Sequence, residues 1–382
     1  MVLEADLEAA RARIADAVVR TPVWRSDELD AALGCSVWLK CEPLQRTGSF
    51  KLRGATNAIR SLPEGTRGVV AMSSGNHAQA VACAGRAAGL PVTVVMNADS
   101  NAAKVAATRG YGATVVSEGV DPTNRDEIAR DLAERDGLAF VHPFDDWNVI
   151  AGQGTATLEL LEEVPGLDAV VTPIGGGGLA AGIGLALRAV APGKRIVGIR
   201  AAREAFALAD GIAVKEPGEL TGPLLDEVLD DVVEVSPDGI AEAIVLLLER
   251  TKLLVEGAGA VGVAALLTGQ IPGTGPVAAV LSGGNIDAST LITVLRYGVT
   301  SAGRHLVVRT SVPDRPGELL KLLQLVAEER VNVLSVEHRR EGVDIPVGAT
   351  GIDLTLLTRD EGHCEALLDQ MRGWGYEVER LR

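Results

Sequence analysis

Short runs of apolar, β-branched residues alternate with Ala- and Leu-rich stretches over roughly the first 300 residues. Runs such as GVVA at Gly68–Ala71 and PVTVVM at Pro91–Met96 have no hydrophilic face, which is typical of strands buried on both sides. The stretches between them have the length and composition of helices. This alternation predicts βαβ units around parallel sheets, an α/β fold whose functional groups lie at the carboxyl ends of strands.

The pattern places these elements at definite positions. The predicted strands are Gly68–Ala71, Pro91–Met96, Ala113–Ser117, Ala139–Val141, Ala169–Ile174, Arg195–Ile199 and Val277–Leu281. The predicted helices are Asn76–Ala88, Asn101–Arg109, Arg125–Arg135, Thr155–Glu163, Leu179–Val190 and Gly239–Arg250.

The last part of the chain has a different pattern. An alternating strand at His305–Val312 precedes a helix with apolar residues at i, i+3, i+4 and i+7, and a second helix repeats this spacing near Cys364–Met371. Two strands, Val331–Arg339 and Gly351–Thr358, lie between the helices, and a last strand lies near Tyr376–Arg380. The order βαββαβ predicts a ferredoxin-like domain. We therefore divide the chain into domains at 1–303 and 304–382.

Composition narrows the class of protein. With 382 residues, 47% of them hydrophobic, the chain can bury the cores of two or three domains. Its net charge of −15 argues against nucleic acid or an anionic membrane as the main partner. No apolar run reaches the ~18 residues of a membrane span, and the charged N-terminal helix does not resemble a signal peptide. The four cysteines lack metal-binding spacing, so we expect reduced thiols and a cytoplasmic protein.

Lysine is rare in this chain, and Lys51 has an unusual setting in the segment TGSFKLRGA at 47–55. Ser49 is a plausible N-cap, which would place Lys51 in the first turn of a helix. The positive end of the helix disfavours the ammonium form and favours a neutral, nucleophilic amine. The alternative is a solvated lysine after a turn, and the segment taken alone favours this alternative.

The stretch SSGNHAQ at 73–79 follows a predicted strand and opens an Ala-rich helix. Hydroxyl groups, a glycine and an asparagine at a helix start form a seat for an anion, and a carboxylate is the natural guest. The alternative is a capping turn in which Ser or Asn caps the helix. For His77 alone we favour an ordinary, hydrogen-bonded helix residue.

Four consecutive glycines, Gly175, Gly176, Gly177 and Gly178, join a predicted strand to the helix that begins at Leu179. Such a turn lets backbone N–H groups converge on a phosphate at a helix N-terminus. It is neither a Walker loop nor a dinucleotide fingerprint, because no GK[ST] and no GxGxxG follow. A flexible loop is the alternative, and phosphate binding is favoured over it.

A fourth motif, SGGN at 282–285, follows the strand Val277–Leu281. The Ser282 hydroxyl could hydrogen-bond a heterocycle nitrogen, and a simple turn is an equal alternative. The four motifs together suit pyridoxal 5′-phosphate and an amino-acid substrate. They would supply a nucleophilic lysine, binding sites for a carboxylate and a phosphate, and a neutral hydrogen-bonding group.

These motifs carry a family resemblance. The segment EPLQRTGSFKLRGA at 42–55, followed in order by SSGNHAQ, GGGGL and SGGN, resembles the fold-type II pyridoxal-phosphate enzymes, which are tryptophan synthase β-like. It is most similar to their threonine/serine dehydratase branch, as are the stretches 142–155 and 209–221. VPDRPGEL at 312–319 resembles an ACT regulatory domain. The resemblance implies a two-lobed α/β catalytic domain at 1–303 and an ACT domain at 304–382.

The resemblance also implies roles for single residues. Lys51 would form the internal Schiff base and then remove the Cα proton of the substrate. The other residues implied to bind the cofactor are Phe50, Asn76, Gly175, Gly176, Gly177, Gly178, Leu179 and Ser282. The residues implied to hold the substrate are Ser74, Gly75, Asn76 and His77. A hydroxyl such as that of Ser282 cannot keep the pyridine nitrogen protonated, so the ring is a weaker electron sink, which favours prompt loss of a β-leaving group.

The implied reaction is β-elimination of water from L-threonine, giving 2-oxobutanoate and ammonia, or from L-serine, giving pyruvate. Two alternatives share the cofactor. A serine racemase needs a second base, for which Ser74 is a candidate. A threonine synthase needs extra cations near residues 73–79, where only His77 is found. An amino-acid sensor with an inactive catalytic domain is a third alternative, but it would have no use for both Lys51 and the four glycines.

The C-terminal domain implies allosteric control by an amino acid such as isoleucine or valine, with Gly317 at the candidate effector site. A role in isoleucine biosynthesis and one in threonine catabolism both stay open. Relatives of this kind are dimers or tetramers, so a homodimer or homotetramer is expected.

This chain departs from the family at two places. About two dozen residues found in relatives are missing between Arg203 and Ala209, where some relatives carry acidic metal ligands, so we expect no metal although Glu204 and Asp210 remain. Gly257 replaces a common proline after Glu256. Glu256 either supports the site from behind or is a surface acid at a helix end.

Overall fold

The computed structural model describes residues 4–381 except 215, 272–274, 341–344 and 346. It divides into two compact units, one ending at Asp287 and the other beginning at Ala288. The helix α12 (Ala288–Ser301) belongs to the second unit by this division. The domain boundary near Gly303 stays a prediction, and each unit is described separately.

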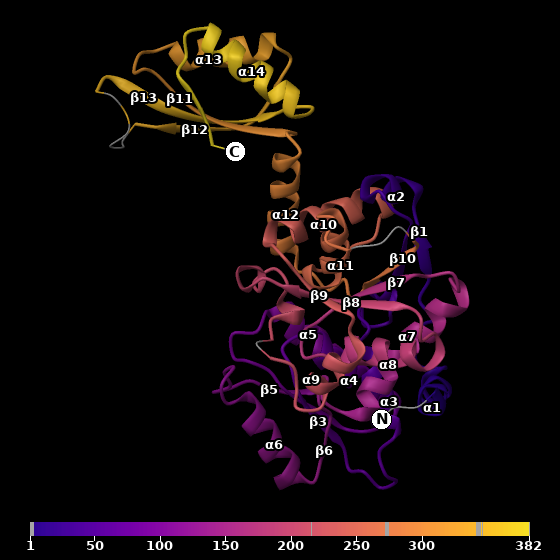
Figure 1. Ribbon diagram of the computed structural model, residues 1–382. Helices are drawn as coiled ribbons and strands as arrows, with labels where there is room; N and C mark the ends of the chain where they lie inside the picture. The colour runs from indigo at the N-terminus through magenta and orange to yellow at the C-terminus, as the bar shows by residue number, and fades with distance from the viewer. Residues whose placement is uncertain (1–3, 215, 272–274, 341–344, 346, 382) are drawn as a thin grey trace. The chain divides into compact units, whose positions relative to one another are not determined.

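The first unit contains a six-stranded sheet in the order β1-β2-β10-β7-β8-β9 (Figure 1). Only β1 is antiparallel to its neighbour, β2, and all other pairs are parallel. The central strands β7 and β10 are buried along their whole length, as their lack of a hydrophilic face predicts. The strands are β1 (Val23–Arg25), β2 (Val37–Cys41), β7 (Ala169–Pro173), β8 (Arg195–Ala201), β9 (Asp231–Val235) and β10 (Val277–Leu281).

A second, smaller sheet in the same unit has the order β5-β4-β3-β6, and its described strand pairs are all parallel. Its strands are β3 (Val69–Met72), β4 (Val92–Val95), β5 (Thr114–Val116) and β6 (Ala139–Phe140). The two sheets form the two lobes expected for this unit, and the α/β prediction is confirmed.

The helices of this unit connect successive strands and cover the sheets (Figure 1). The α-helices are α1 (Glu4–Ile14), α2 (Asp27–Leu33), α3 (Lys51–Arg60), α4 (Asn76–Ala87), α5 (Ala102–Gly110), α6 (Arg125–Asp136), α7 (Trp147–Glu163), α8 (Gly178–Val190), α9 (Thr221–Val228), α10 (Pro237–Thr251) and α11 (Gly257–Leu267). The 3-10 helices are η1 (Glu42–Leu44), η2 (Arg203–Ala205) and η3 (Asp210–Ile212). The predicted helix at Thr155–Glu163 is the second half of α7, which begins eight residues earlier at Trp147.

The second unit has an antiparallel sheet in the order β12-β13-β11-β14, with two helices packed on one face. Alternate residues of β11, from Leu306 to Val312, are buried under the helices. Leu322 and Val326 of α13 are buried in the same core. This confirms the ferredoxin-like βαββαβ prediction. The elements are β11 (His305–Pro313), α13 (Glu318–Glu328), β12 (Asn332–Arg339), β13 (Ala349–Leu357), α14 (Glu361–Gly373) and β14 (Val378–Arg380).

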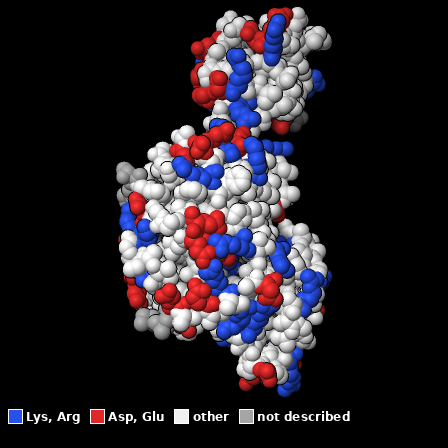
Figure 2. Space-filling view, turned by 90° about the vertical axis from the view of Figure 1, so that its right-hand side faces the viewer, with Lys and Arg blue, Asp and Glu red and all other residues white. Residues whose placement is uncertain are grey.

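The surface carries charges of both signs. Acidic and basic side chains are intermixed on the face shown in Figure 2, so the net charge of −15 is not gathered in one acidic block on that face. Within the part of the chain that the structure describes, no helix combines the length and hydropathy needed to cross a membrane.

Candidate active site

Two turns that are far apart in the sequence meet beside the six-stranded sheet. The turn before α3 pairs with the turn after β10, because Phe50 N–H donates to the Ser282 carbonyl at 3.0 Å and Gly284 N–H to the Gly48 carbonyl at 2.9 Å. Ser49 and Gly283 form a β-bridge between these contacts. The structure therefore brings the segment of Lys51 against the SGGN motif.

Lys51 is the first residue of α3, as predicted, but Ser49 is not its N-cap. Phe50 occupies the N-cap position and makes no capping hydrogen bond through its side chain. The prediction for Ser49 is wrong because its backbone is engaged in the bridge to Gly283, and its buried hydroxyl has no hydrogen-bond partner among the described residues.

The Lys51 amine lies in an environment that disfavours its charge. Its Nζ donates a hydrogen bond to the Pro143 carbonyl at 2.7 Å and lies 5.1 Å from the centre of the Phe50 ring. Burial lowers the pKa of Lys51 to about 8, although the Glu256 carboxyl acts in the opposite direction. At pH 7 roughly a tenth of such amines would be neutral, far more than for an ordinary lysine, and the neutral form is the one that a nucleophile or proton acceptor requires. The solvated-lysine interpretation is therefore wrong.

The start of α4 is open to an anion. Gly75 is the N-cap and no side chain caps the helix, so the alternative of a Ser or Asn cap is wrong. The Ser74 hydroxyl accepts hydrogen bonds from Asn97 N–H at 3.0 Å and from the Ser100 hydroxyl at 2.9 Å. The first N–H groups of α4 are thus available to a carboxylate.

His77 is a buried, neutral residue of α4. Its Nε2 lies 3.0 Å from the Val141 carbonyl, and burial, assisted by the charge of Lys51, lowers its pKa to about 3. The side chain is the hydrogen-bonded helix residue favoured by the sequence. Its implied backbone contact with a substrate stays a prediction.

The four glycines join β7 to α8. Gly177 caps α8 in the left-handed region at φ 95°, and Gly178 is the first helical residue. A side chain at Gly176 would collide with the Phe144 ring, so the turn must be made of backbone alone. This leaves the N–H groups of the turn at the positive end of α8, a cradle of backbone that favours an anion such as a phosphate.

Sequence reasoning missed the residues that brace this cradle. The Thr221 hydroxyl donates to the Gly176 carbonyl at 2.6 Å and accepts from Gly218 N–H at 2.8 Å. Asp145 Oδ1 accepts from the N–H groups of Leu220 and Thr221 at 3.0 and 2.9 Å. Asp145 lies in the stretch 142–155 and Thr221 in the stretch 209–221. The resemblance of these stretches to the dehydratases was the only signal that could have pointed to the two residues.

Glu256 is buried at the site and is not a surface acid. Its Oε1 accepts a hydrogen bond from Asn76 Nδ2 at 2.7 Å, and Asn285 Nδ2 donates to Asn76 Oδ1 at 2.8 Å. Burial raises the pKa of Glu256 to about 7, and the charge of Asp210 contributes to the shift. The amide of Asn76 is therefore fixed in orientation from two sides.

Comparisons with known proteins agree with this geometry. Residues 14–283 match the family model described as pyridoxal-phosphate dependent enzyme, and residues 306–372 match the ACT domain. The chain is 42% identical to an L-threonine ammonia-lyase of Thermotoga maritima, with 99% of each chain covered. It is also similar to the crystal structure of a threonine deaminase from T.th. (43% identity, TM-score 0.71, 75% of this chain and 99% of that chain) and to that of serine racemase from Dictyostelium discoideum (37%, TM-score 0.71, 75% and 99%).

The chain belongs to the family of pyridoxal-phosphate-dependent enzymes. In this enzyme the residues present fit the cofactor. The cradle at the start of α8 suits its phosphate, and Lys51 supplies a partly buried amine with a lowered pKa. Ser282, which follows β10 and is 2% exposed, would be an uncharged partner for the ring nitrogen, and Asn76, whose amide is held by Glu256, would meet the ring oxygen. These last two contacts stay predictions.

Arg125, the first residue of α6, adds a cation that the sequence did not indicate near the carboxylate seat. Its Nη1 donates to Asn97 Oδ1 at 3.4 Å, and Asn97 in turn contacts Ser74. Its buried Nε has no hydrogen-bond partner among the described residues, and burial lowers its pKa. The enzyme therefore has more positive charge near this seat than residues 73–79 alone suggest.

The region of the missing residues contains an ion pair. Lys104 of α5 pairs with Asp210 of η3. Among the described residues, no group of three or more His, Cys, Asp or Glu side chains is arranged to bind a metal. The expectation that the enzyme needs no metal stays a prediction.

Proposed function

We propose that this chain is an L-threonine ammonia-lyase, a carbon–nitrogen lyase. It eliminates water from L-threonine to leave an enamine, which then takes up water and releases ammonia to give 2-oxobutanoate. L-serine would give pyruvate by the same route. The observation that carries the proposal is the placement of the Lys51 amine, with its lowered pKa, in a segment that is hydrogen-bonded to the neutral Ser282. The similarity to L-threonine ammonia-lyase over nearly the full length supports the choice of substrate.

In this mechanism pyridoxal 5′-phosphate, when bound, withdraws electrons from the substrate and weakens its Cα–H bond. Lys51 accepts the Cα proton through its neutral amine. The N–H groups at the start of α4, next to Ser74 and Gly75, bind the substrate carboxylate. The main chain of Gly175–Gly178 and Leu179 binds the cofactor phosphate.

Ser282, which carries no charge, and Glu256, which is only partly ionised at neutral pH, set the balance of charge in the site. The Ser282 hydroxyl leaves the ring nitrogen without a fixed proton, which favours elimination over transamination. The carboxyl of Glu256, whose pKa is raised to about 7, is protonated in a large fraction of molecules at neutral pH and keeps Asn76 aligned.

The direct test is to incubate the purified protein with pyridoxal 5′-phosphate and L-threonine and to measure 2-oxobutanoate. L-serine is assayed in parallel for both pyruvate and D-serine. A Lys51→Ala variant should produce no keto acid and lose the visible absorption of the bound cofactor. D-serine without any keto acid would overturn the lyase proposal in favour of a racemase.

The ACT domain gives this enzyme a second place for an amino acid. Gly317 caps α13 in the left-handed region at φ 93°, and no described atom lies within 4 Å of where its side chain would project. A ligand can therefore approach the backbone there, and we propose isoleucine or valine as the effector.

We also propose that the enzyme is a homodimer or homotetramer and that it is cytoplasmic. The four free cysteines support the cytoplasmic location.

A further inference from the structure

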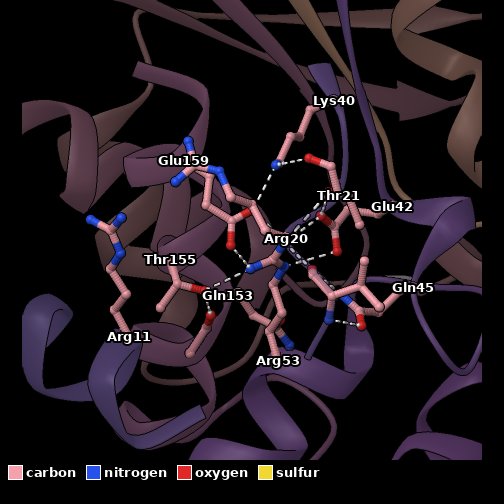
Figure 3. A network of polar contacts seen from close by, with 12 residues as sticks. Arg11, Arg20, Thr21, Lys40, Glu42, Gln45, Arg53, Gln153, Thr155 and Glu159 are labelled. Atoms are coloured by element: carbon pink, nitrogen blue, oxygen red, sulfur yellow. Dashed lines mark hydrogen bonds and ion pairs between the residues drawn. The ribbon is translucent and has the colours of Figure 1, made fainter. Parts of the chain in front are cut away.

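Four charged side chains are buried together in the first unit: Lys40, Glu42, Arg53 and Glu159 (Figure 3). None of their side chains is more than 8% exposed. Two are cations and two are anions, so the cluster is neutral. The mechanism above uses none of them.

Arg53 is the centre of this cluster. Its Nε and Nη2 donate to the two oxygens of Glu42, both at 2.9 Å, and its Nη1 and Nη2 donate to the two oxygens of Glu159 at 2.7 and 2.8 Å. A planar guanidinium can bind two carboxylates in this way, whereas a lysine ammonium cannot.

The remaining polar atoms of the cluster are also satisfied. Lys40 Nζ donates to Glu159 Oε2 at 2.6 Å and to the Thr21 carbonyl at 2.7 Å. The Thr21 hydroxyl donates to Glu42 Oε1 at 2.6 Å. Because of these cations, the pKa of Glu42 is lowered even though burial alone would raise it. The cluster is a complete network with a single geometry.

The cluster connects the elements that surround Lys51. Arg53 lies two residues after Lys51, in the same first turn of α3. Lys40 and Glu42 flank Cys41 at the end of β2, which pairs with Leu281 immediately before Ser282. Glu159 belongs to α7, which follows the segment whose Pro143 carbonyl binds the Lys51 amine.

We propose that the Arg53 cluster is a positioning device that fixes the first turn of α3, and with it the Lys51 amine, relative to β10 and Ser282. The start of α3 lacks a side-chain cap, and the bridge between Ser49 and Gly283 holds only the backbone of the turn that precedes it. The Arg53 side chain adds contacts that tie the first helical turn itself to Glu42 and Glu159. A buried ion-pair network is a poor source of net stability compared with apolar packing, but it defines one geometry. The inference depends on the proposed function in one respect only, namely that Lys51 is the residue that reacts with the cofactor.

The test compares Arg53→Lys with a matched control, Arg188→Lys. Arg188 lies near the far end of α8 and donates to the Val228 carbonyl and to Asp230, away from the site. Each variant is mixed with pyridoxal 5′-phosphate without threonine. The rate at which Lys51 captures the cofactor is followed by borohydride reduction and mass analysis of the Lys51 peptide, and the melting temperature is measured alongside.

We expect capture to slow by at least about tenfold in Arg53→Lys, because misplacement by a fraction of an ångström is enough, and to stay at the wild-type rate in Arg188→Lys. Wild-type capture in Arg53→Lys overturns the proposal. The capture assay needs no catalytic turnover, so it is independent of the proposed reaction. If the wild-type chain captures the cofactor but yields no 2-oxobutanoate, the proposed function is contradicted and the positioning role is not.

A second variant covers the case in which Arg53→Lys does not fold. The double variant Lys40→Met/Glu159→Gln removes one cation and one anion, so the cluster stays neutral and the bidentate Arg53–Glu42 pair is kept. We expect it to fold and to slow capture by a smaller factor, about threefold, in the same direction. Capture at the wild-type rate here would equally reject a positioning role.

Discussion

At the scale of single residues, the site depends on groups whose charge is suppressed by burial. Lys51 has a pKa lowered to about 8, His77 one lowered to about 3, and Glu256 one raised to about 7, all chiefly because burial disfavours the charged form. Ser282 adds a group that cannot ionise. At neutral pH these shifts leave His77 uncharged, Glu256 about half ionised, and a larger neutral fraction of Lys51 than an ordinary lysine would have.

The Glu256 carboxyl gives a prediction for stability. Its raised pKa means that the folded state favours the protonated form, so its contribution is fully present below the unfolded pKa of 4.5 and is lost as the pH rises through about 7. Between pH 5 and 8, the unfolding free energy of the wild-type protein should therefore fall by up to roughly 3 kcal/mol more than that of Glu256→Gln. Urea unfolding of both proteins at each pH measures this. Parallel pH curves would contradict the raised pKa.

Ser282 gives a prediction for the type of reaction. In Ser282→Asp, a carboxylate would hold a proton on the ring nitrogen and strengthen the electron sink. We expect the rate of 2-oxobutanoate formation to fall at least about tenfold, with transamination of the cofactor becoming detectable. The uncharged variant Ser282→Ala is the control and should show no transamination. If Ser282→Ala also showed transamination, the change of reaction could not be attributed to the added carboxylate.

At the scale of elements, the sequence predicted most strands of the first unit, β3 to β8 and β10, because their apolar runs end near glycine, serine or asparagine. It missed β1, β2 and β9, although β2 is largely buried, and it placed helix limits less well. The first half of α7 was missed because Gly152 and Gly154 look like helix breakers, although close packing against α3 and α8 requires them. The helix α11 was missed because it is buried on all sides and has no polar periodicity.

The same limit applies to the site. Lys51, Ser74, Asn76, the glycines and Ser282 stand in recognisable local motifs. The braces Thr221 and Asp145 do not, because their partners are 45 and 75 or more residues away. The ion pair between Arg53 and Glu159 joins residues 106 positions apart, a distance over which a single sequence carries no pairing signal.

The glycine cradle gives a prediction at this scale. In Gly176→Ala the new methyl group would collide with the Phe144 ring, so the turn between β7 and α8 must shift and its N–H groups lose their convergence. We expect the Kd for pyridoxal 5′-phosphate to rise at least about tenfold. The control is Gly166→Ala, where no described atom lies within 4 Å of the added methyl group. Equal affinity in both variants would show that this turn does not bind the phosphate.

At the scale of the whole molecule, the chain combines a unit that holds the chemistry with a unit that has its own closed core. The buried residues of the second unit form a separate cluster from β11, β13, α13 and α14. A domain with its own core can bind a ligand without supplying any group to the reaction, so a second amino acid can bind there without competing with the substrate. Regulation then requires that the two sites be energetically coupled.

The regulatory role gives the last prediction. In the full chain, isoleucine or valine should change the apparent affinity for threonine at least about fivefold, the usual lower range of allosteric coupling. The same rates are measured on a chain that ends at Gly303 and on full-length Gly317→Val, in which a β-branched residue would be forced into φ 93°. Both should keep turnover without effector and lose the response. An undiminished response in the shortened chain would place the effector site in the first unit, because no ACT residue would be left to bind the amino acid.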